Sequence, residues 1–339
     1  MHDPNHKSPQ RSATILIRSG EMAAHFTMGE AIACMADAFA GLSAGTSVVP
    51  ERYIVDSPDG GLTLLMKPAF AGDQSTSGVK ILSQRNTGPL QGIPTITGIV
   101  MLFDTRTGEL LSLLDGGYIT ALRTGAAAGL ATDLLARKES RNLAVFGCGA
   151  QGRTQLEAVC TVREIANIWL FDLSRERAES LRAEMEKRIS AKIVIAHDLL
   201  VLEEVDIVCT ATNATQPLFR REHIRPGTHV NAIGSFKPHM QELDPEMVRS
   251  SRIFFDDQKA CIRESGDLVK ALRRFGNLDD RISGGIGDLV AGKIAGRTSP
   301  GEITLFKSVG TAIQDLAVAD RIYQKSRKLG FGEEIRFHE

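Results

Sequence analysis

The chain has 339 residues, 42% of them hydrophobic and 24% charged, and its 40 basic and 41 acidic residues give a formal net charge of −1. This globular composition suits about two domains of roughly 150 residues each, and the balanced charge predicts no nucleic-acid partner. No apolar run could span a bilayer, and the polar start lacks the apolar segment of a signal peptide. We therefore expect no membrane association and a cytoplasmic location.

The cysteines and histidines indicate no metal site. The five cysteines are scattered without a C-x-x-C spacing, and the eight histidines show no metal-ligand spacing. We therefore expect no bound metal and reduced thiols. Cys148 lies in a glycine-rich loop before a predicted helix. We expect it to serve there as a small residue that fits the loop, and not as a reactive thiol.

The N-terminal part is predicted to combine one helix with a largely antiparallel sheet. Residues 1 to about 12 are polar and aperiodic, so we expect them to be disordered. Thr27 and Glu30 have the spacing of a capping box, and apolar residues follow at helical spacing to near Gly41. Strands are expected at 50–55, 62–66, 79–82, 95–103 and 110–114, with a turn at 59–61 and a hairpin connection at 104–108.

From about Thr120 the pattern changes to strands that alternate with helices. Helices are expected at 121–136, 175–187 and about 310–325, and a further one is expected to begin at Asp244-Pro245 after a loop that contains His239 and Glu242. Short apolar strands are expected at 142–146, 168–172, near 193, at 206–210 and at 229–233. This alternation predicts βαβ units and a parallel sheet.

A glycine motif within this region indicates a dinucleotide site. Gly147-Cys148-Gly149-Ala150-Gln151-Gly152 is a G-x-G-x-x-G between a predicted strand and a predicted helix. Gly147 allows the tight turn, Gly149 lets the backbone approach a pyrophosphate, and Gly152 lets the helix pack against the strand. The phosphates would then lie at the helix N-terminus.

The next predicted strand ends in a carboxylate, Asp172, about 20 residues further on, as this fingerprint requires. A carboxylate there accepts hydrogen bonds from ribose hydroxyls and repels a 2′-phosphate, which favours NAD(H). Arg175 and Arg177 follow closely and could reach a phosphate, so NADP(H) stays open. Later strands end at the expected cofactor edge with Thr210, Thr212 and residues 231–235. The alternative is that these are small residues required only by the turns.

Several segments resemble the ornithine cyclodeaminase and mu-crystallin family. The resemblance is carried by Gly116-Gly117-Tyr118-Ile119-Thr120-Ala121-Leu122-Arg123-Thr124-Gly125-Ala126-Ala127, by 147–152, by Asn231-Ala232-Ile233-Gly234-Ser235 and by 302–310. It extends from about Thr27 to Tyr323. It implies an α/β fold, with a Rossmann domain at 128–316 and an α+β substrate-binding and dimerisation domain made of 1–127 with 317–339. It also implies a homodimer, and cofactor contacts from Ile233 and Ser308.

The resemblance places three cations, Arg52, Lys80 and Arg123, at the substrate carboxylate. A guanidinium binds a carboxylate through two parallel hydrogen bonds, and a lysine adds a point charge. From the residues alone, an internal ion pair, for example with Asp115, is the alternative. Thr95 matches a further position of the pocket, with Thr97 as the other possible register.

The position of Phe236 departs from the cyclodeaminases, which carry an aspartate there. Phenylalanine cannot accept a proton or bind an amine, and its apolar ring suits a flat ring substrate. The imine reductases of the family also lack this aspartate. The resemblance therefore implies NAD(P)H-dependent reduction of a cyclic imino acid, 1-pyrroline-2-carboxylate to L-proline, or of the six-membered 1-piperideine-2-carboxylate to L-pipecolate. Lys80 is the candidate proton donor, because burial and cationic neighbours lower a lysine pKa. The alternatives are an ornithine cyclodeaminase, an amino-acid dehydrogenase that uses an open-chain keto acid, and a protein that only binds a cofactor or ligand.

Overall fold

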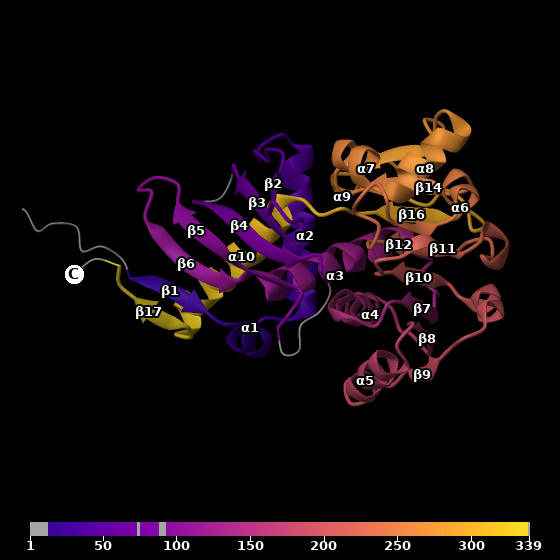
Figure 1. Cartoon of the computed structure of the whole chain (residues 1–339), viewed down its shortest axis with the longest axis horizontal. Coiled ribbons are helices and arrows are strands. Elements are labelled where there is room, and N and C mark those ends of the chain that lie inside the picture. Colours follow the sequence, from indigo (N-terminus) through magenta and orange to yellow (C-terminus); the bar gives the residue numbers. More distant parts are fainter. Residues whose placement is uncertain (1–12, 73–74, 88–92, 338–339) are drawn as a thin grey trace, which may run out of the picture.

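The computed structural model describes residues 13–72, 75–87 and 93–337, and it consists of two units that lie side by side (Figure 1). The predicted disorder of residues 1 to 12 lies outside the described residues. The first unit is a seven-stranded sheet in the order β17-β1-β6-β5-β4-β3-β2. Its strands are β1 (Thr14–Ile17), β2 (Tyr53–Asp56), β3 (Leu62–Phe70), β4 (Thr76–Arg85), β5 (Ile96–Asp104), β6 (Leu110–Asp115) and β17 (Glu333–Ile335).

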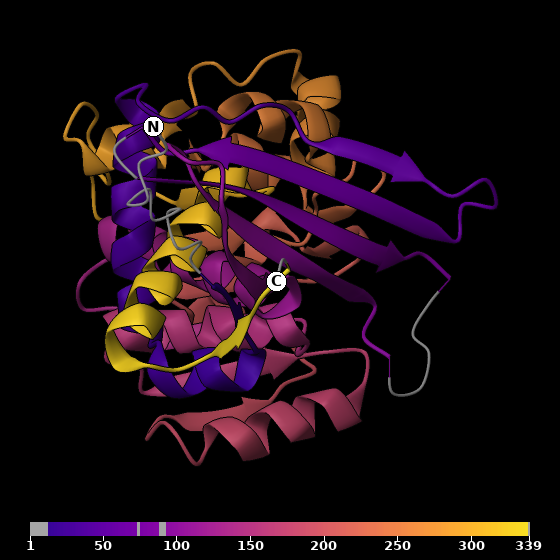
Figure 2. The same ribbon diagram turned by 90° about the vertical axis from the view of Figure 1, so that its left-hand side faces the viewer.

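Helices cover one face of this sheet. α10 (Ala312–Leu329) packs across β3, β4 and β5, and α3 (Gly116–Leu135) packs against β4, β5 and β6. α2 (Met28–Ser43) packs against both of these helices (Figure 2), and α1 (Ser19–His25) follows β1. The predicted capping box is confirmed, because Thr27 and Glu30 cap the first turn of α2 reciprocally. The strands alternate as a half-covered sheet requires: Leu64 and Phe70 of β3 are exposed, whereas Lys67 and Ala69 are buried against the helices.

The second unit is an eight-stranded parallel sheet in the order β15-β14-β16-β12-β10-β7-β8-β9, so the predicted Rossmann fold is confirmed. Its strands are β7 (Asn142–Phe146), β8 (Asn167–Phe171), β9 (Lys192–Ile195), β10 (Ile207–Thr210), β12 (His229–Ala232), β14 (Arg252–Phe255), β15 (Ile282–Gly285) and β16 (Thr304–Lys307). Its helices include α4 (Ala150–Val162), α5 (Arg175–Met185), α6 (Pro245–Arg249), α7 (Gln258–Glu264), α8 (Gly266–Phe275) and α9 (Ile286–Val290). β11 (Thr215–Phe219) and β13 (Gln241–Leu243) form a small separate sheet.

Helix α3 (Gly116–Leu135) joins the two units, and it begins five residues before the predicted Ala121. The Asp115 side chain accepts a hydrogen bond from the Tyr118 backbone N–H and caps the helix. The low helix propensity of two successive glycines hid this start from the sequence. The predicted domain boundaries, after residues 127 and 316, fall within α3 and α10. The division of the chain at these points therefore stays a proposal.

Candidate functional site

The glycine loop between β7 and α4 has the geometry that a pyrophosphate needs. Gly147 has φ of +94°, and a Cβ on Gly152 would lie 1.7 Å from the Gly147 carbonyl oxygen, so both positions require glycine. A Cβ on Gly149 would meet nothing within 4 Å, which leaves open space in front of this backbone. Gly149 is also the N-cap of α4 and provides no side-chain cap for the first-turn N–H groups, where Ala150 and Gln151 lie.

Asp172 lies at the end of β8 beside this loop. Its Oδ2 accepts a hydrogen bond from the Cys148 backbone N–H at 2.7 Å, and its Oδ1 pairs with the Arg177 guanidinium at 2.8 Å. Hydrogen bonds from Arg177, Cys148 and Ser174 hold the pKa of Asp172 below its usual value against the opposing effect of burial. Arg175 is exposed and pairs with Glu179 instead. Burial and the neighbouring carboxylate raise the pKa of the Cys148 thiol to about 12, so this cysteine is not a reactive thiolate.

The ends of β10 and β12 are held together by a buried carboxylate, Glu242. Its oxygens accept hydrogen bonds from the Thr212 N–H and hydroxyl and from the Thr210 hydroxyl. They also accept the N–H groups of Gly234 and Ser235. The predicted loop position of Glu242 is wrong, because this residue lies in β13 and is fully buried. No periodic pattern marks such a residue, since its partners come from two distant strands.

Ser308 follows β16 and is fixed by a second buried carboxylate. Asp256 Oδ2 accepts hydrogen bonds from the Ser308 hydroxyl at 2.6 Å and from the Gly310 N–H at 2.7 Å. Ile233, which follows β12, is 8% exposed. The structure thus brings the predicted cofactor residues Gly147, Asp172, Thr210, Thr212, Ile233 and Ser308 to the C-terminal edge of one parallel sheet.

Three cations lie in a row across the other sheet. Lys67 on β3 is directly opposite Lys80 on β4, so both side chains lie on the face that the helices cover. Tyr53 on β2 is opposite Met66 on the antiparallel strand β3. Arg52, one residue before Tyr53, therefore lies beside Lys67 and continues the row. Arg123, on α3, reaches the same place from the helix side. Lys67 was not predicted from the sequence, because a lysine before Pro68 looks like an exposed residue of a turn.

One aspartate on α10 binds two of these cations. Asp315 Oδ1 lies 2.7 Å from Lys80 Nζ and 2.9 Å from Arg123 Nε, and all three side chains are nearly inaccessible to solvent. Asp315 Oδ2 has no hydrogen-bond partner among the described residues. Arg123 also donates to Gln314 Oε1 at 2.6 Å. The internal ion pair considered from the sequence is therefore present, but its partner is Asp315 and not Asp115, whose carboxylate caps α3.

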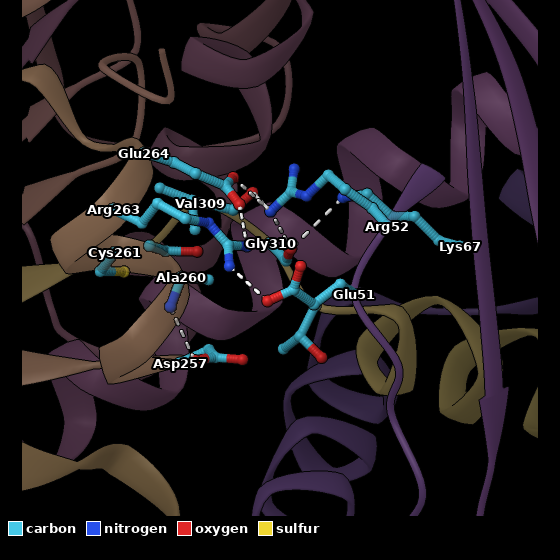
Figure 3. Close-up of polar contacts among 12 residues, drawn as sticks. Glu51, Arg52, Lys67, Asp257, Ala260, Cys261, Arg263, Glu264, Val309 and Gly310 are labelled. Carbon is cyan, nitrogen blue, oxygen red and sulfur yellow. Dashed lines mark hydrogen bonds and ion pairs between the residues drawn. The ribbon is translucent and has the colours of Figure 1, made fainter. Parts of the chain in front are cut away.

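Arg52 and Lys67 meet at the backbone between β16 and α10 (Figure 3). Both donate to the Gly310 carbonyl oxygen, at 3.1 Å from Arg52 Nη2 and 3.3 Å from Lys67 Nζ. Arg52 also forms an ion pair at 2.9 Å with Glu264, which ends α7 in the other unit. The Cβ of any residue at Gly310, which has φ of +81°, would lie 2.7 Å from the Arg123 guanidinium. Gly310 is therefore in contact with three of the cations.

Burial and mutual repulsion perturb the lysines of this cluster. Burial, partly offset by Asp315, lowers the pKa of Lys80 from 10.5 to about 8, as expected from the sequence. Burial, followed by repulsion from Lys80 and Arg52, lowers the pKa of Lys67 well below its usual value. The pKa of Asp315 is lowered by the cations around it, although burial alone would raise it. The cluster can therefore accept an anion, and Lys80, with a pKa of about 8, can exchange a proton near neutral pH.

Two predicted substrate residues lie elsewhere. Thr95 and Thr97 are both exposed, and Val100, not Thr95, is opposite Lys80 on β5. At about 3.4 Å per residue, Thr95 is roughly 17 Å along the strand from the row of cations. Phe236 is half-buried at the end of β12 and packs against the Rossmann core. Thr95 and Phe236 stay predictions as substrate contacts.

Among the described residues, no group of three or more histidine, cysteine, aspartate or glutamate side chains could hold a metal ion. Within the same part of the chain, no helix has the length and apolar character to cross a membrane.

The chain was compared with known proteins. It is 35% identical over 325 residues to a Delta(1)-pyrroline-2-carboxylate reductase of Bacillus cereus, with 95% of this chain and 100% of the relative covered. The structure of the Thermococcus litoralis Delta(1)-pyrroline-2-carboxylate reductase in complex with NADH and L-proline matches with a TM-score of 0.90 and 35% identity, over 95% of this chain and 100% of that one. An archaeal alanine dehydrogenase dimer with bound NAD matches with a TM-score of 0.88 and 31% identity, over 96% and 100%. A sequence profile of the ornithine cyclodeaminase/mu-crystallin family matches residues 13–329, and the chain belongs to this family.

Proposed function

We propose that this chain is an NAD(P)H-dependent oxidoreductase that reduces a cyclic imino acid, 1-pyrroline-2-carboxylate, to L-proline. The observation that carries the proposal is the buried cluster of Arg52, Lys67, Lys80 and Arg123. This cluster suits a small carboxylate, and it adjoins a sheet whose glycine loop suits a dinucleotide. The similarity to pyrroline-2-carboxylate reductases over nearly the whole chain supports the same assignment.

The residues of the glycine loop fit a nicotinamide dinucleotide. Gly149 leaves room for the pyrophosphate, and the uncapped N–H groups at the start of α4 face it. Asp172 would accept hydrogen bonds from the ribose hydroxyls, and its negative charge favours NAD(H) over NADP(H). Glu242 would keep the ends of β10 and β12 in place at the cofactor edge of the sheet, since it fixes Thr212 and Gly234. When bound, the cofactor supplies the hydride.

The cations would hold and orient the substrate. Lys80 and Arg123 would bind the carboxylate while Asp315 fixes their positions, and Arg52 would close over it from the side of Glu264. This fixed orientation supplies much of the rate enhancement. Lys80 would donate the proton to the imine nitrogen, because its lowered pKa lets it lose a proton near neutral pH.

The absence of a carboxylate at Phe236 favours imine reduction over cyclodeamination. The ring of Phe236 is half-buried, and its backbone N–H donates to Gly234 at the end of β12. A side chain without hydrogen-bonding atoms cannot orient the amine of ornithine there. An open-chain imino acid, reduced in the manner of an alanine dehydrogenase, is the second candidate. It is favoured by the archaeal dimer with bound NAD.

We also propose a homodimer that forms through the outer face of the first sheet. Large apolar side chains on this face of β2 and β3 are exposed: Tyr53 at 62%, Val55 at 52%, Leu64 at 40% and Phe70 at 52%. A contiguous apolar surface of this kind is typical of a protein interface. Light scattering on the purified protein would measure the mass, and a monomer would refute the dimer.

The proposed reaction is tested by following the nicotinamide absorbance with 1-pyrroline-2-carboxylate and NADH or NADPH. Ornithine with NAD⁺ is run in parallel, with ammonia as the readout. We expect rapid oxidation of the reduced cofactor with the imine and no ammonia from ornithine. Ammonia and proline from ornithine would refute the reductase, and turnover of pyruvate with ammonia but not of the imine would support the second candidate.

A further inference from the structure

Lys67 and Lys80 form an unusual pair within the sheet. They are directly opposite each other on β3 and β4, their exposed fractions are 6% and 1%, and they lie on the same face. Like charges at directly opposite positions destabilise a sheet, and burial increases the cost. A fold that keeps both lysines therefore needs either a compensating anion or an uncharged lysine at this place.

No carboxylate among the described residues forms an ion pair with Lys67. Asp315 binds Lys80 and Arg123, and Glu264 binds Arg52. In the part of the chain that the structure describes, the Lys67 ammonium has one hydrogen bond, to the Gly310 carbonyl at 3.3 Å. With both lysines protonated, the four cations and two carboxylates would carry an excess of two positive charges. One substrate carboxylate would neutralise part of this excess.

The geometry directs Lys67 to the same anion as its neighbours. Figure 3 shows the Arg52 and Lys67 side chains approaching the Gly310 carbonyl together, with Glu264 on the opposite side of Arg52. The Arg123 guanidinium lies against the Cα side of this same glycine. Three of the cationic groups therefore lie at Gly310, and Lys80 is opposite Lys67 on the neighbouring strand.

We propose that Lys67 is a substrate-binding residue, whose ammonium group contacts the substrate carboxylate and takes up its proton together with that anion. The inference rests on the proposed function in one respect, namely that the anion is the carboxylate of a cyclic imino acid. The charged groups around Lys67 are Arg52 before β2, Lys80 on β4, Arg123 on α3 and Asp315 on α10. Glu264 on α7 lies beyond Arg52, and Arg263 pairs with Glu51 at the rim.

The lowered pKa of Lys67 agrees with this role. Burial and the three cations among its charged neighbours disfavour the ammonium form of Lys67 in the free enzyme. A carboxylate bound among these cations reverses the local field and favours the ammonium form. Binding of an anionic ring is therefore coupled to proton uptake, and an uncharged ring of the same shape gains nothing from Lys67.

The test is calorimetric titration of the enzyme–NADH complex with pyrrole-2-carboxylate, a flat anionic ring without a reducible C=N bond. Pyrrole-2-carboxamide is the uncharged counterpart, and each titration is repeated in phosphate and in Tris, whose ionisation enthalpies differ. The variants are Lys67→Met and Lys67→Arg. The matched control is Lys293→Met, since Lys293 Nζ also donates to a backbone carbonyl, that of Ser43 at 2.8 Å, outside the cluster.

We expect Lys67→Met to weaken binding of the carboxylate at least about tenfold, as loss of one charge-assisted hydrogen bond implies, and to leave the carboxamide within about threefold. Lys67→Arg keeps the charge and should retain binding, but with less proton uptake than the wild type. If Lys67→Met does not fold, Lys67→Arg still tests the proposal. Lys293→Met should behave as the wild type.

Equal losses for carboxylate and carboxamide, or unchanged proton uptake in Lys67→Arg, would assign Lys67 a purely structural role and overturn the inference. A wild-type enzyme that binds pyrrole-2-carboxylate with this dependence on Lys67, but does not reduce 1-pyrroline-2-carboxylate, would refute the proposed reaction and leave the role of Lys67 intact. A wild-type enzyme that binds neither ring would overturn both.

Discussion

Replacement of Asp315 by asparagine removes the one carboxylate that Lys80 and Arg123 share. Lys80 Nζ and Arg123 Nε both lie within 3 Å of Asp315 Oδ1, and the aspartate side chain is 2% exposed. Removing one partner from a buried ion pair costs roughly 3–5 kcal/mol, because the other charges stay buried and unpaired. We therefore expect Asp315→Asn to destabilise the protein by an amount of this order.

The size of the change in Tm follows from the length of the chain. An unfolding entropy of about 2.1 cal/mol/K per residue over 339 residues gives about 1.4 °C per kcal/mol, hence a decrease of roughly 4–7 °C. Calorimetry of the ligand-free protein would measure it. Asp280→Asn is the control, since its pair with Arg249 has a similar distance of 2.9 Å at the surface and should leave the Tm nearly unchanged. A decrease in Asp315→Asn no larger than that of the control would refute this account of the cluster.

Three further outcomes are expected. Because the folded protein lowers the pKa of Lys80 from 10.5 to about 8, the unfolded chain binds more protons between these values, so stability should rise with pH across this window by roughly 3 kcal/mol. Urea denaturation should show a smaller rise in Lys80→Met, and an equal rise would contradict the assignment. Gly310→Ala should raise the KM for the imine about tenfold or more, because the added Cβ would displace Arg123. Gly330→Ala is the control, since Gly330 also has a positive φ but an added Cβ there would lie in open space. This control should lower only the stability of the protein. Asp172→Asn should lower the preference for NADH over NADPH, measured as the ratio of kcat/KM values, at least about tenfold, and an unchanged ratio would mean that this carboxylate does not repel a 2′-phosphate.

Local patterns in the sequence were sufficient for the first part of the Rossmann unit, from β7 to Asp172. The strand 142–146, the glycines and Asp172 are within one stretch of the chain, so their spacing alone predicts the strand, the turn and the helix. The capping box at Thr27 is equally local. β14, β15 and β16 were not predicted individually, because short buried strands lack a distinct period. β1 and β17 pair across the whole length of the chain, which no local pattern reveals.

The charged core of the candidate site depends on long-range pairing. Asp315 is 192 residues from Arg123, and Glu264 lies in the other unit from Arg52. Sequence reasoning found the cations through the family resemblance, but it named Asp115 as the example of an internal partner because Asp115 is near Arg123 in the chain. Lys67 could have been found from the strand register, since the antiparallel pairing of 62–70 with 76–85 places it opposite Lys80.

The most direct test of the central claim is to follow deuterium from 4,4-dideuterated NADH into the product formed from 1-pyrroline-2-carboxylate. The account predicts L-proline with one deuterium on the ring carbon that bears the carboxylate, for each NADH oxidised. This result would show hydride transfer to the C=N carbon of a bound cyclic imine. Oxidation of NADH without labelled proline, or proline without deuterium at that carbon, would contradict the claim.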